Sequence, residues 1–522
     1  MYLSYSLLVG SACVPLGMLA ATTALLRACE QSVGLAGPTP SMLEDEDPSK
    51  LPLFRHLPSL RGKLAWRPLG DFPTPVHDAS VGAHRFQVKR EDLSSSLYGG
   101  NKVRTLEHQL AVVEANLEAS ARQGSAEQDM GAVPRGSIGV LGSSGSNQVV
   151  AAAVHSARQN SQGRFRLPKV KALWCSPDAP DLDNSLNLLS TLSLSHVGAY
   201  STGVAAVFDA LKMLTASKAT GGGTLIPLGG NSPSGVLGHV SAALELAEQI
   251  AEGDAAAVDA IYLAVGSSCT ISGLVVGVVL SRHLGLAAYQ NPSFKIHGVL
   301  VHPLFALAQR TINLHSSAPF LPLTISHTVR EACKALTSLG GPDLERDALL
   351  FVETSVTLHT EASLVGEYGA HSSLSRAAAN EFDARGEVRA KRRRSEGSAV
   401  VGSSSGGEEG VSGQEGGGAG KSKAVVPPPL KLWLCGHFVA KAYAALLADL
   451  EADPELKAVL WQTKSTTQPL GAQDEWAKLR AMPSDIKAWA NQGKAESALR
   501  PGSVNVEGGG PEDYRGLMTK IE

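Results

Sequence analysis

The chain has 522 residues, with 46 Lys or Arg against 49 Asp or Glu, so its formal net charge is −3. This balance argues against a nucleic-acid-binding protein, which would carry an excess of basic residues, and aromatic residues at 5% offer few platforms for base stacking. The six cysteines form no CxxC pair, which argues against a disulfide framework or a zinc site. Length and composition therefore favour a soluble α/β enzyme of two or more folded units.

The N-terminal segment is apolar. Residues 1–26 contain no charged residue and are long enough to span a bilayer, which takes about 20 residues. However, Gly10, Pro15 and Gly17 interrupt the run, and no basic residue precedes it. We expect residues 1–30 to be a hydrophobic leader or a membrane segment, followed by a polar linker over 31–50. The location is left open between cytoplasmic, organellar and membrane-anchored through residues 1–26.

Strand-like and helix-like segments alternate along the region that we expect to fold, residues 51–465. Short apolar, β-branched runs predict strands at 137–142, 169–174, 221–230, 259–266 and 295–301. Helical spacing of apolar residues follows these runs, most clearly over 201–220 and 232–253. Repeated βα units predict a parallel sheet with helices on both faces. Ligands of such sheets bind at the carboxyl ends of the strands.

Two segments near the C-terminus have a different composition. Residues 385–429 contain a basic cluster at 391–394, a Gly/Ser/Glu-rich run and three consecutive prolines, which predicts a disordered insertion. The basic cluster could bind a polyanion, but a solvated charge run is the favoured interpretation. The tail over 466–522 has helical pieces rich in Trp and Ala and offers no catalytic pattern.

One loop of the predicted α/β region could place a reactive amine. Gly99, Gly100 and Asn101 stand directly before Lys102, and such a turn can deliver a lysine into a cleft at the start of a helix. A lysine in a dry site near a helix N-terminus has a lowered pKa, which makes it a better nucleophile and base. On this segment alone, an ordinary surface lysine after a glycine turn remains the simpler interpretation.

Two further loops follow predicted strands and are rich in Gly and Ser. The loop at 142–148 offers hydroxyl groups, amides and main-chain N–H groups, and the loop at 266–273 could hold a phosphate at a helix N-terminus. Neither a GxGxxG nor a GxxxxGK[ST] pattern is present. A poised lysine, an oxygen-binding loop and a phosphate-binding turn in one α/β chain indicate pyridoxal phosphate, whose aldehyde needs an amine and whose phosphate needs an anchor.

The sequence resembles the D-cysteine desulfhydrase and 1-aminocyclopropane-1-carboxylate deaminase group of pyridoxal-phosphate enzymes. The resemblance covers most of residues 50–465 in the expected order. It rests on FPTPVH (72–77), VKREDLSSSLYGGNKVRTLE (88–107), GSSGSNQVVAA (142–152), IPLGGNSPSGVLGHVSAALELAEQ (226–249), VGSSCTISGLVVG (265–277), EYG (367–369) and, more weakly, AKAYAALL (440–447). It implies a two-domain, tryptophan synthase β-like (fold type II) architecture with the smaller domain at about 95–200, and a homodimer.

The resemblance also implies roles for individual residues. Lys102 would bind the cofactor aldehyde and take the substrate Cα proton. Asn147 would contact the phenolic oxygen of the cofactor, and Ser146 and Gln148 would bind the substrate carboxylate, with Ser146 also placed to move a proton. The phosphate would rest on the turn formed by Gly266, Ser267, Ser268, Cys269 and Thr270. Tyr368 would line the substrate side of the ring.

The chain departs from the family pattern after the long insertion. The family usually has Tyr followed by Thr or Glu, where this sequence has Phe438 and Val439. Phe438 keeps a ring that can stack on the cofactor but loses a hydroxyl, and Val439 would remove the polar partner of the pyridine nitrogen. Alternatively, the 385–429 insertion displaces the alignment and another residue supplies that partner.

The function expected from these observations is a pyridoxal-phosphate-dependent lyase or deaminase of a small amino acid, D-cysteine desulfhydrase-like in the first place. A 1-aminocyclopropane-1-carboxylate deaminase-like enzyme and a cofactor-binding protein without turnover are the alternatives, and a membrane-tethered interaction protein is a weaker one. No metal and no nucleic acid are expected, and a membrane is a partner only if the leader is retained.

Overall fold

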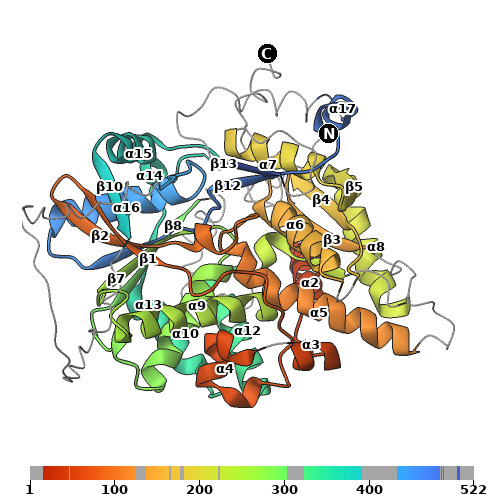
Figure 1. The fold of residues 1–522 in the computed structure, drawn as a ribbon, viewed down its shortest axis with the longest axis horizontal. Coiled ribbons are helices and arrows are strands. Elements are labelled where there is room, and N and C mark those ends of the chain that lie inside the picture. Colours follow the sequence, from red (N-terminus) through yellow and green to blue (C-terminus); the bar gives the residue numbers. More distant parts are fainter. Residues whose placement is uncertain are drawn as a thin grey trace, which may run out of the picture.

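The structure is a computed structural model of the chain. It describes residues 16–482 except 46, 124–136, 164–165, 177–181, 221–223, 302–322, 368 and 391–431, together with 484, 486 and 502–505. Two mostly parallel β-sheets, each covered by helices, divide the described residues into two α/β domains (Figure 1).

The sheet of the larger domain has seven strands among the described residues, in the order β10-β1-β2-β11-β7-β8-β9. Its strands are β1 (Val76–Val81), β2 (His84–Lys89), β7 (Ala260–Val265), β8 (Lys295–Leu300), β9 (Val356–His359), β10 (Gly386–Ala390) and β11 (Ala458–Trp461). Neighbouring strands run parallel from β2 to β9, whereas β1 pairs antiparallel with both β2 and β10.

Helices cover both faces of this sheet because its central strands are apolar on both sides. Successive side chains of a strand point to opposite faces. Ile261 and Leu263 of β7 therefore enter one core, and Ala260 and Tyr262 enter the other. The first core is closed by α9 (Pro233–Ala251), α10 (Cys269–His283), α12 (Ile325–Ser338) and α13 (Glu345–Ser355), and the second by α15 (Ser373–Arg385) and α16 (Val439–Ala452).

The sheet of the smaller domain is parallel, with the strand order β5-β4-β3-β6 in the described part of the chain. Its strands are β3 (Ile138–Ser143), β4 (Val170–Ser176), β5 (Val197–Thr202) and β6 (Thr224–Ile226). One face packs on α5 (Lys102–Gln123), α6 (Asn147–Ser161) and α7 (Leu182–Ser193), and the other on α2 (Leu16–Ser32) and α8 (Gly203–Thr220). The two-domain parallel α/β class predicted from the sequence is confirmed.

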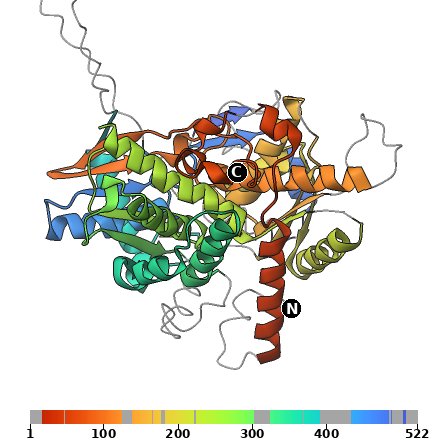
Figure 2. The same cartoon turned by 90° about the horizontal axis from the view of Figure 1, so that it is seen from below.

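The boundaries predicted for the N-terminal segment are wrong where the structure describes it. Helix α2 projects from the body of the molecule (Figure 2), yet its C-terminal end is packed: Cys29 is fully buried, and the carboxylate of Glu30 lies 3.1 Å from His327. Residues 31–50 are not a free linker, because the Ser234 hydroxyl donates to the carbonyl of Val33 and Met42 of α3 (Pro40–Asp45) is buried. Among the described residues, no helix combines the length and the hydrophobicity of a membrane span.

The expected C-terminal boundaries also need correction. Residues 386–390 form strand β10 rather than part of an insertion, and the basic cluster lies outside the described residues. The smaller domain extends beyond residue 200 to β6 and recruits part of the tail. There β12 (Thr467–Leu470) pairs with β13 (Gly502–Asn505), and α17 (Glu475–Arg480) packs on α7. Buried Gln468 donates to Asn187 and Ser190, so apolar and polar contacts both hold the tail in place.

Candidate active site

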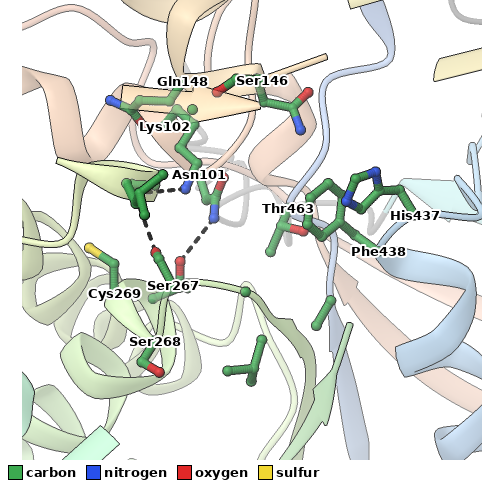
Figure 3. A pocket seen from close by; sticks show the side chains of 18 of the residues that line it. Asn101, Lys102, Ser146, Gln148, Ser267, Ser268, Cys269, His437, Phe438 and Thr463 are labelled. Carbon is green, nitrogen blue, oxygen red and sulfur yellow. Dashed lines mark hydrogen bonds between the residues drawn. The ribbon is translucent and has the colours of Figure 1, made fainter. Parts of the chain in front are cut away.

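Lys102 begins helix α5 after a turn that requires glycine. Gly100 has a φ of +98°, and a Cβ at Gly99 would lie 2.2 Å from the carbonyl oxygen of Asp92. The N–H of Gly100 donates to the carbonyl of Glu91 at 2.8 Å. The turn therefore lies flat against residues 91–92, and the side chain of Lys102 points into the pocket between the two domains (Figure 3).

A buried ionic network supports this turn. Arg104, two residues after Lys102, donates to the carboxylates of Glu91 at 2.6 Å and Glu245 at 2.8 Å. Lys89 donates to Glu245 at 2.6 Å and is fully buried. The charged residues of the VKREDL segment thus bind helix α9 of the larger domain to helix α5 of the smaller one, which fixes the start of α5.

The loop after β7 lines the same pocket as Lys102. Ser268 has a φ of +66° and caps the 15-residue helix α10, so the first main-chain N–H groups of that helix have no helical acceptors and are suited to bind an anion. The side-chain amide of Asn101 donates to the Thr270 hydroxyl at 2.9 Å and ties this turn to the lysine. Burial raises the pKa of the Cys269 thiol to about 11, so the thiol stays protonated near neutral pH.

The loop between β3 and α6 forms the upper wall. Ser146 precedes α6, and its side chain lines the pocket together with Asn147 and Gln148. The side-chain oxygen and nitrogen of Gln148 are both buried and find no partner among the described residues. An unpaired buried amide costs stability unless a ligand completes its hydrogen bonds, so Gln148 indicates a bound polar group here.

The burial of Lys102 affects the protonation of its amine. Nζ donates to the carbonyl of Gly229 at 3.0 Å. Burial lowers the pKa of this amine below its ordinary value of 10.5. The neutral amine is the form that adds to an aldehyde or removes a proton, so the site favours the reactive form of Lys102.

The remaining wall comes from Phe438, which was predicted, and from three residues that the sequence did not single out, His437, Thr463 and Lys464. His437 stacks on Phe438 with ring centroids 4.0 Å apart, and Thr463 and Lys464 follow strand β11. The carbonyl of Thr463 accepts from the N–H of Asn101 at 3.0 Å. The sequence did contain a signal for Thr463 and Lys464. They lie in a polar stretch after the apolar run at 458–461, and ligands bind at the carboxyl ends of parallel strands.

The structure brings nearly all predicted site residues into this one pocket. Those that line it are Lys102, Ser146, Asn147, Gln148, Gly266, Ser267, Ser268, Cys269, Thr270 and Phe438. Tyr368 lies outside the described residues. The expectation for Val439 is wrong: it is fully buried in the core under α16 and does not line the pocket, which has the Thr463 side chain in its wall instead. The roles of the lining residues stay predictions.

Comparison with known proteins identifies the family of the chain and the cofactor of this pocket. The family model described as "Pyridoxal-phosphate dependent enzyme" matches residues 68–392, more than half of the chain. The chain belongs to the pyridoxal-phosphate-dependent enzyme family. Its cofactor is therefore pyridoxal phosphate, and its architecture is that of the fold type II enzymes in this family.

The chain is similar to a curated protein and to several solved structures. The chain is 30% identical over 207 residues to the "Putative 1-aminocyclopropane-1-carboxylate deaminase" of Pyrococcus furiosus, covering 39% of this chain and 54% of that protein. The chain thus matches about half the length of this curated relative. Among solved structures it is similar to an ACC deaminase homologue (17% identity, 79% of this chain, 94% of the other, TM-score 0.47) and to the serine racemase of Dictyostelium discoideum (16%, 75%, 91%, TM-score 0.37).

The pocket of this pyridoxal-phosphate-dependent enzyme fits its cofactor. The aldehyde has an amine available at Lys102, and the phosphate has the N-terminus of α10. Room for the phosphate exists above Gly266, where a Cβ would meet no atom of the protein closer than 3.9 Å. The lining side chains are neutral or basic among the described residues, which suits an anionic ligand.

Gly266→Ala tests the position of the phosphate. The added methyl group fits the protein alone, so we expect an unchanged unfolding temperature, but it occupies the space above the turn. The dissociation constant of pyridoxal phosphate should rise at least about tenfold, a cost of about 1.4 kcal/mol. Fluorescence titration of the cofactor measures this, with Gly37→Ala, where a Cβ meets no atom within 4 Å, as the control. Unchanged affinity in Gly266→Ala would place the phosphate elsewhere.

Proposed function

We propose that the protein is a pyridoxal-phosphate-dependent lyase that removes a β-substituent from a small amino acid, with D-cysteine as the first candidate substrate. The reaction would convert D-cysteine and water to the three-carbon 2-oxo acid, ammonia and hydrogen sulfide. The observation that carries the proposal is the convergence of the Lys102 amine, the unpaired Gln148 amide and the α10 turn on one pocket.

Different residues of the pocket would have different roles in this reaction. When bound, the cofactor supplies an aldehyde that condenses with amines and a ring that accepts the electrons left at Cα. The substrate amine would replace Lys102 at the cofactor aldehyde. The freed, neutral Nζ of Lys102 would then remove the Cα proton, and a positioned base contributes about 10²–10⁴-fold to the rate of such a step. Gln148 and Ser146 hold the substrate carboxylate and fix the Cα–H bond toward Lys102.

The choice of a thiol-bearing substrate rests on the pocket lining. Sulfide is a good leaving group and needs no carboxylic acid to assist it, and the described lining residues include no Asp or Glu. Opening a cyclopropane ring requires a further proton transfer to carbon. A 1-aminocyclopropane-1-carboxylate deaminase activity is the second candidate, because the Pyrococcus furiosus relative carries that name. The homodimer implied by the resemblance stays a prediction.

A substrate panel tests the proposal. Purified protein loaded with pyridoxal phosphate is incubated with D-cysteine, L-cysteine and 1-aminocyclopropane-1-carboxylate, and 2-oxo acid, ammonia and sulfide are measured separately. We expect all three products in equal amounts from D-cysteine. Ammonia and a four-carbon 2-oxo acid from the cyclopropane substrate alone would favour the deaminase.

The same panel addresses a protein that binds the cofactor without turnover, which the missing hydroxyl at Phe438 motivates. A visible absorbance band with no product from any substrate would contradict the lyase and support that alternative. Lys102→Ala is the negative control for product formation.

A further inference from the structure

Lys464 is a second lysine in the wall of the cofactor pocket. Its side chain is 3% exposed, and Nζ donates to the Tyr98 hydroxyl at 3.1 Å, to Oδ1 of Asn187 at 3.1 Å and to Oδ1 of Asn147. Three oxygen acceptors match the three N–H donors of an ammonium group. The rings of Tyr98 and Trp433 lie 5.4 and 5.9 Å from Nζ, within the range of cation–π attraction.

This cluster fixes the side-chain amide of Asn147. Besides Lys464, the Tyr98 hydroxyl donates to its Oδ1 at 2.8 Å and Nδ2 of Asn187 donates to it at 2.9 Å. Asn187 is itself held by the carbonyl of Gly145 and by Gln468. Because the oxygen end of Asn147 accepts three donors, its Nδ2 is the end left for the pocket. Within the described residues, that nitrogen has no hydrogen-bond partner.

We propose that Lys464 is a positioning residue for the cofactor: it holds Asn147 so that Nδ2 donates to the phenolic oxygen of pyridoxal phosphate, and its positive charge favours the ionised form of that oxygen. The inference rests on the proposed function, because it assigns Asn147 to the phenolic oxygen. The inference goes beyond the proposed function because it assigns to Lys464 an influence on the ionisation of the bound cofactor.

The positive charge predicts a spectroscopic effect with a definite sign. We expect the visible absorbance band of the loaded protein to fade with rising pH, because a proton would leave the nitrogen of Lys102 that is bound to the cofactor. A nearby ammonium makes that loss easier, so Lys464 should lower the pH midpoint of the band. Among the described residues, the titratable groups facing or directly behind this part of the pocket are Lys102, Cys269, His437, Lys464, Tyr98 and His239.

The test compares Lys464→Met, which removes the charge, with Lys464→Arg, which keeps it. We expect Lys464→Met to raise the pH midpoint of the visible band by about one unit and to weaken cofactor binding about tenfold. Lys464→Arg should return the midpoint at least halfway to that of the unaltered protein. Lys464→Gln, which is neutral but keeps a hydrogen-bond donor, serves the same purpose as Lys464→Met if the latter does not fold.

Lys63→Met is the control, because the Nζ of Lys63 also donates to an oxygen, the carbonyl of Leu339 at 2.9 Å, and neither residue lines the pocket. Its pH midpoint should equal that of the unaltered protein. A coloured protein in which neutral residues at 464 leave the midpoint unchanged would overturn this inference alone. A colourless unaltered protein would overturn the proposed function and this inference with it.

Discussion

Lys102→Ala is expected to abolish the visible absorbance of the protein incubated with pyridoxal phosphate and to lower product formation at least 10²–10⁴-fold, about the contribution of a positioned base. Both effects share one cause, since this amine binds the aldehyde and removes the Cα proton. Nζ lies 3.0 Å from the carbonyl of Gly229, and its burial lowers the pKa of the amine, which favours the neutral, reactive form. Absorbance spectra and steady-state assays measure the two effects.

Reduction with borohydride separates this explanation from a loss of folding. In the unaltered protein the reduced cofactor should be found by mass spectrometry on the peptide that contains Lys102, and not on the one that contains Lys464. Lys334→Ala, at an exposed lysine paired with Glu331, should retain colour and activity. Cofactor attached to Lys464 in the unaltered protein would contradict the assignment.

Glu245→Gln is expected to destabilise the protein by about 3–5 kcal/mol, the cost of removing one partner from a buried ion pair. Glu245 accepts from both Lys89 and Arg104, and all three side chains are buried. The variant leaves those two cations with Glu91 as the nearest carboxylate partner. Urea unfolding of the cofactor-free protein measures the free energy. Because the network holds the turn before Lys102, cofactor binding should weaken as well.

The control lies one turn along the same helix. Glu248 pairs with Arg55 and lies 3.0 Å from His56, with about a fifth of its side chain exposed. Glu248→Gln should cost no more than about 1 kcal/mol, as is usual for pairs in contact with solvent. Equal losses in the two variants would contradict the special role given to the buried network.

The loss of stability expected in Glu245→Gln should depend on pH with a definite sign. Burial alone would raise the pKa of Glu245, but Arg104 and Lys89 hold it at about 2, below its ordinary value of 4.5. A carboxylate with a depressed pKa adds stability above its unfolded pKa and loses that contribution as the pH falls toward the folded pKa. The difference between the unaltered protein and Glu245→Gln should therefore be full at pH 7 and shrink below about pH 4.5.

Local patterns in the sequence were sufficient for the βα core. The strand predicted at 259–266 is β7, and the helix predicted after it is α10, because an all-apolar run and its following glycine-rich turn specify a central parallel strand without help from distant residues. The turn before Lys102 could also be predicted from the local sequence. Gly99 is required by its close contact with Asp92, and Gly100 by its positive φ.

The far wall of the pocket could not be predicted in the same way. Thr463 and Lys464 reach the site only because β11 inserts between β2 and β7, which are distant from it in sequence. The placement of residue 439 failed for a related reason: after the long insertion, the sequence does not show which turn of α16 faces the pocket. Packing decides that, and it turns Val439 into the core.

The most direct test of the central claim is a crystal structure of the protein with pyridoxal phosphate bound. The account predicts electron density continuous from Nζ of Lys102 to the cofactor, with the phosphate on the main chain of residues 266–270. Density for the cofactor attached to another side chain, or with its phosphate away from the N-terminus of α10, would contradict it.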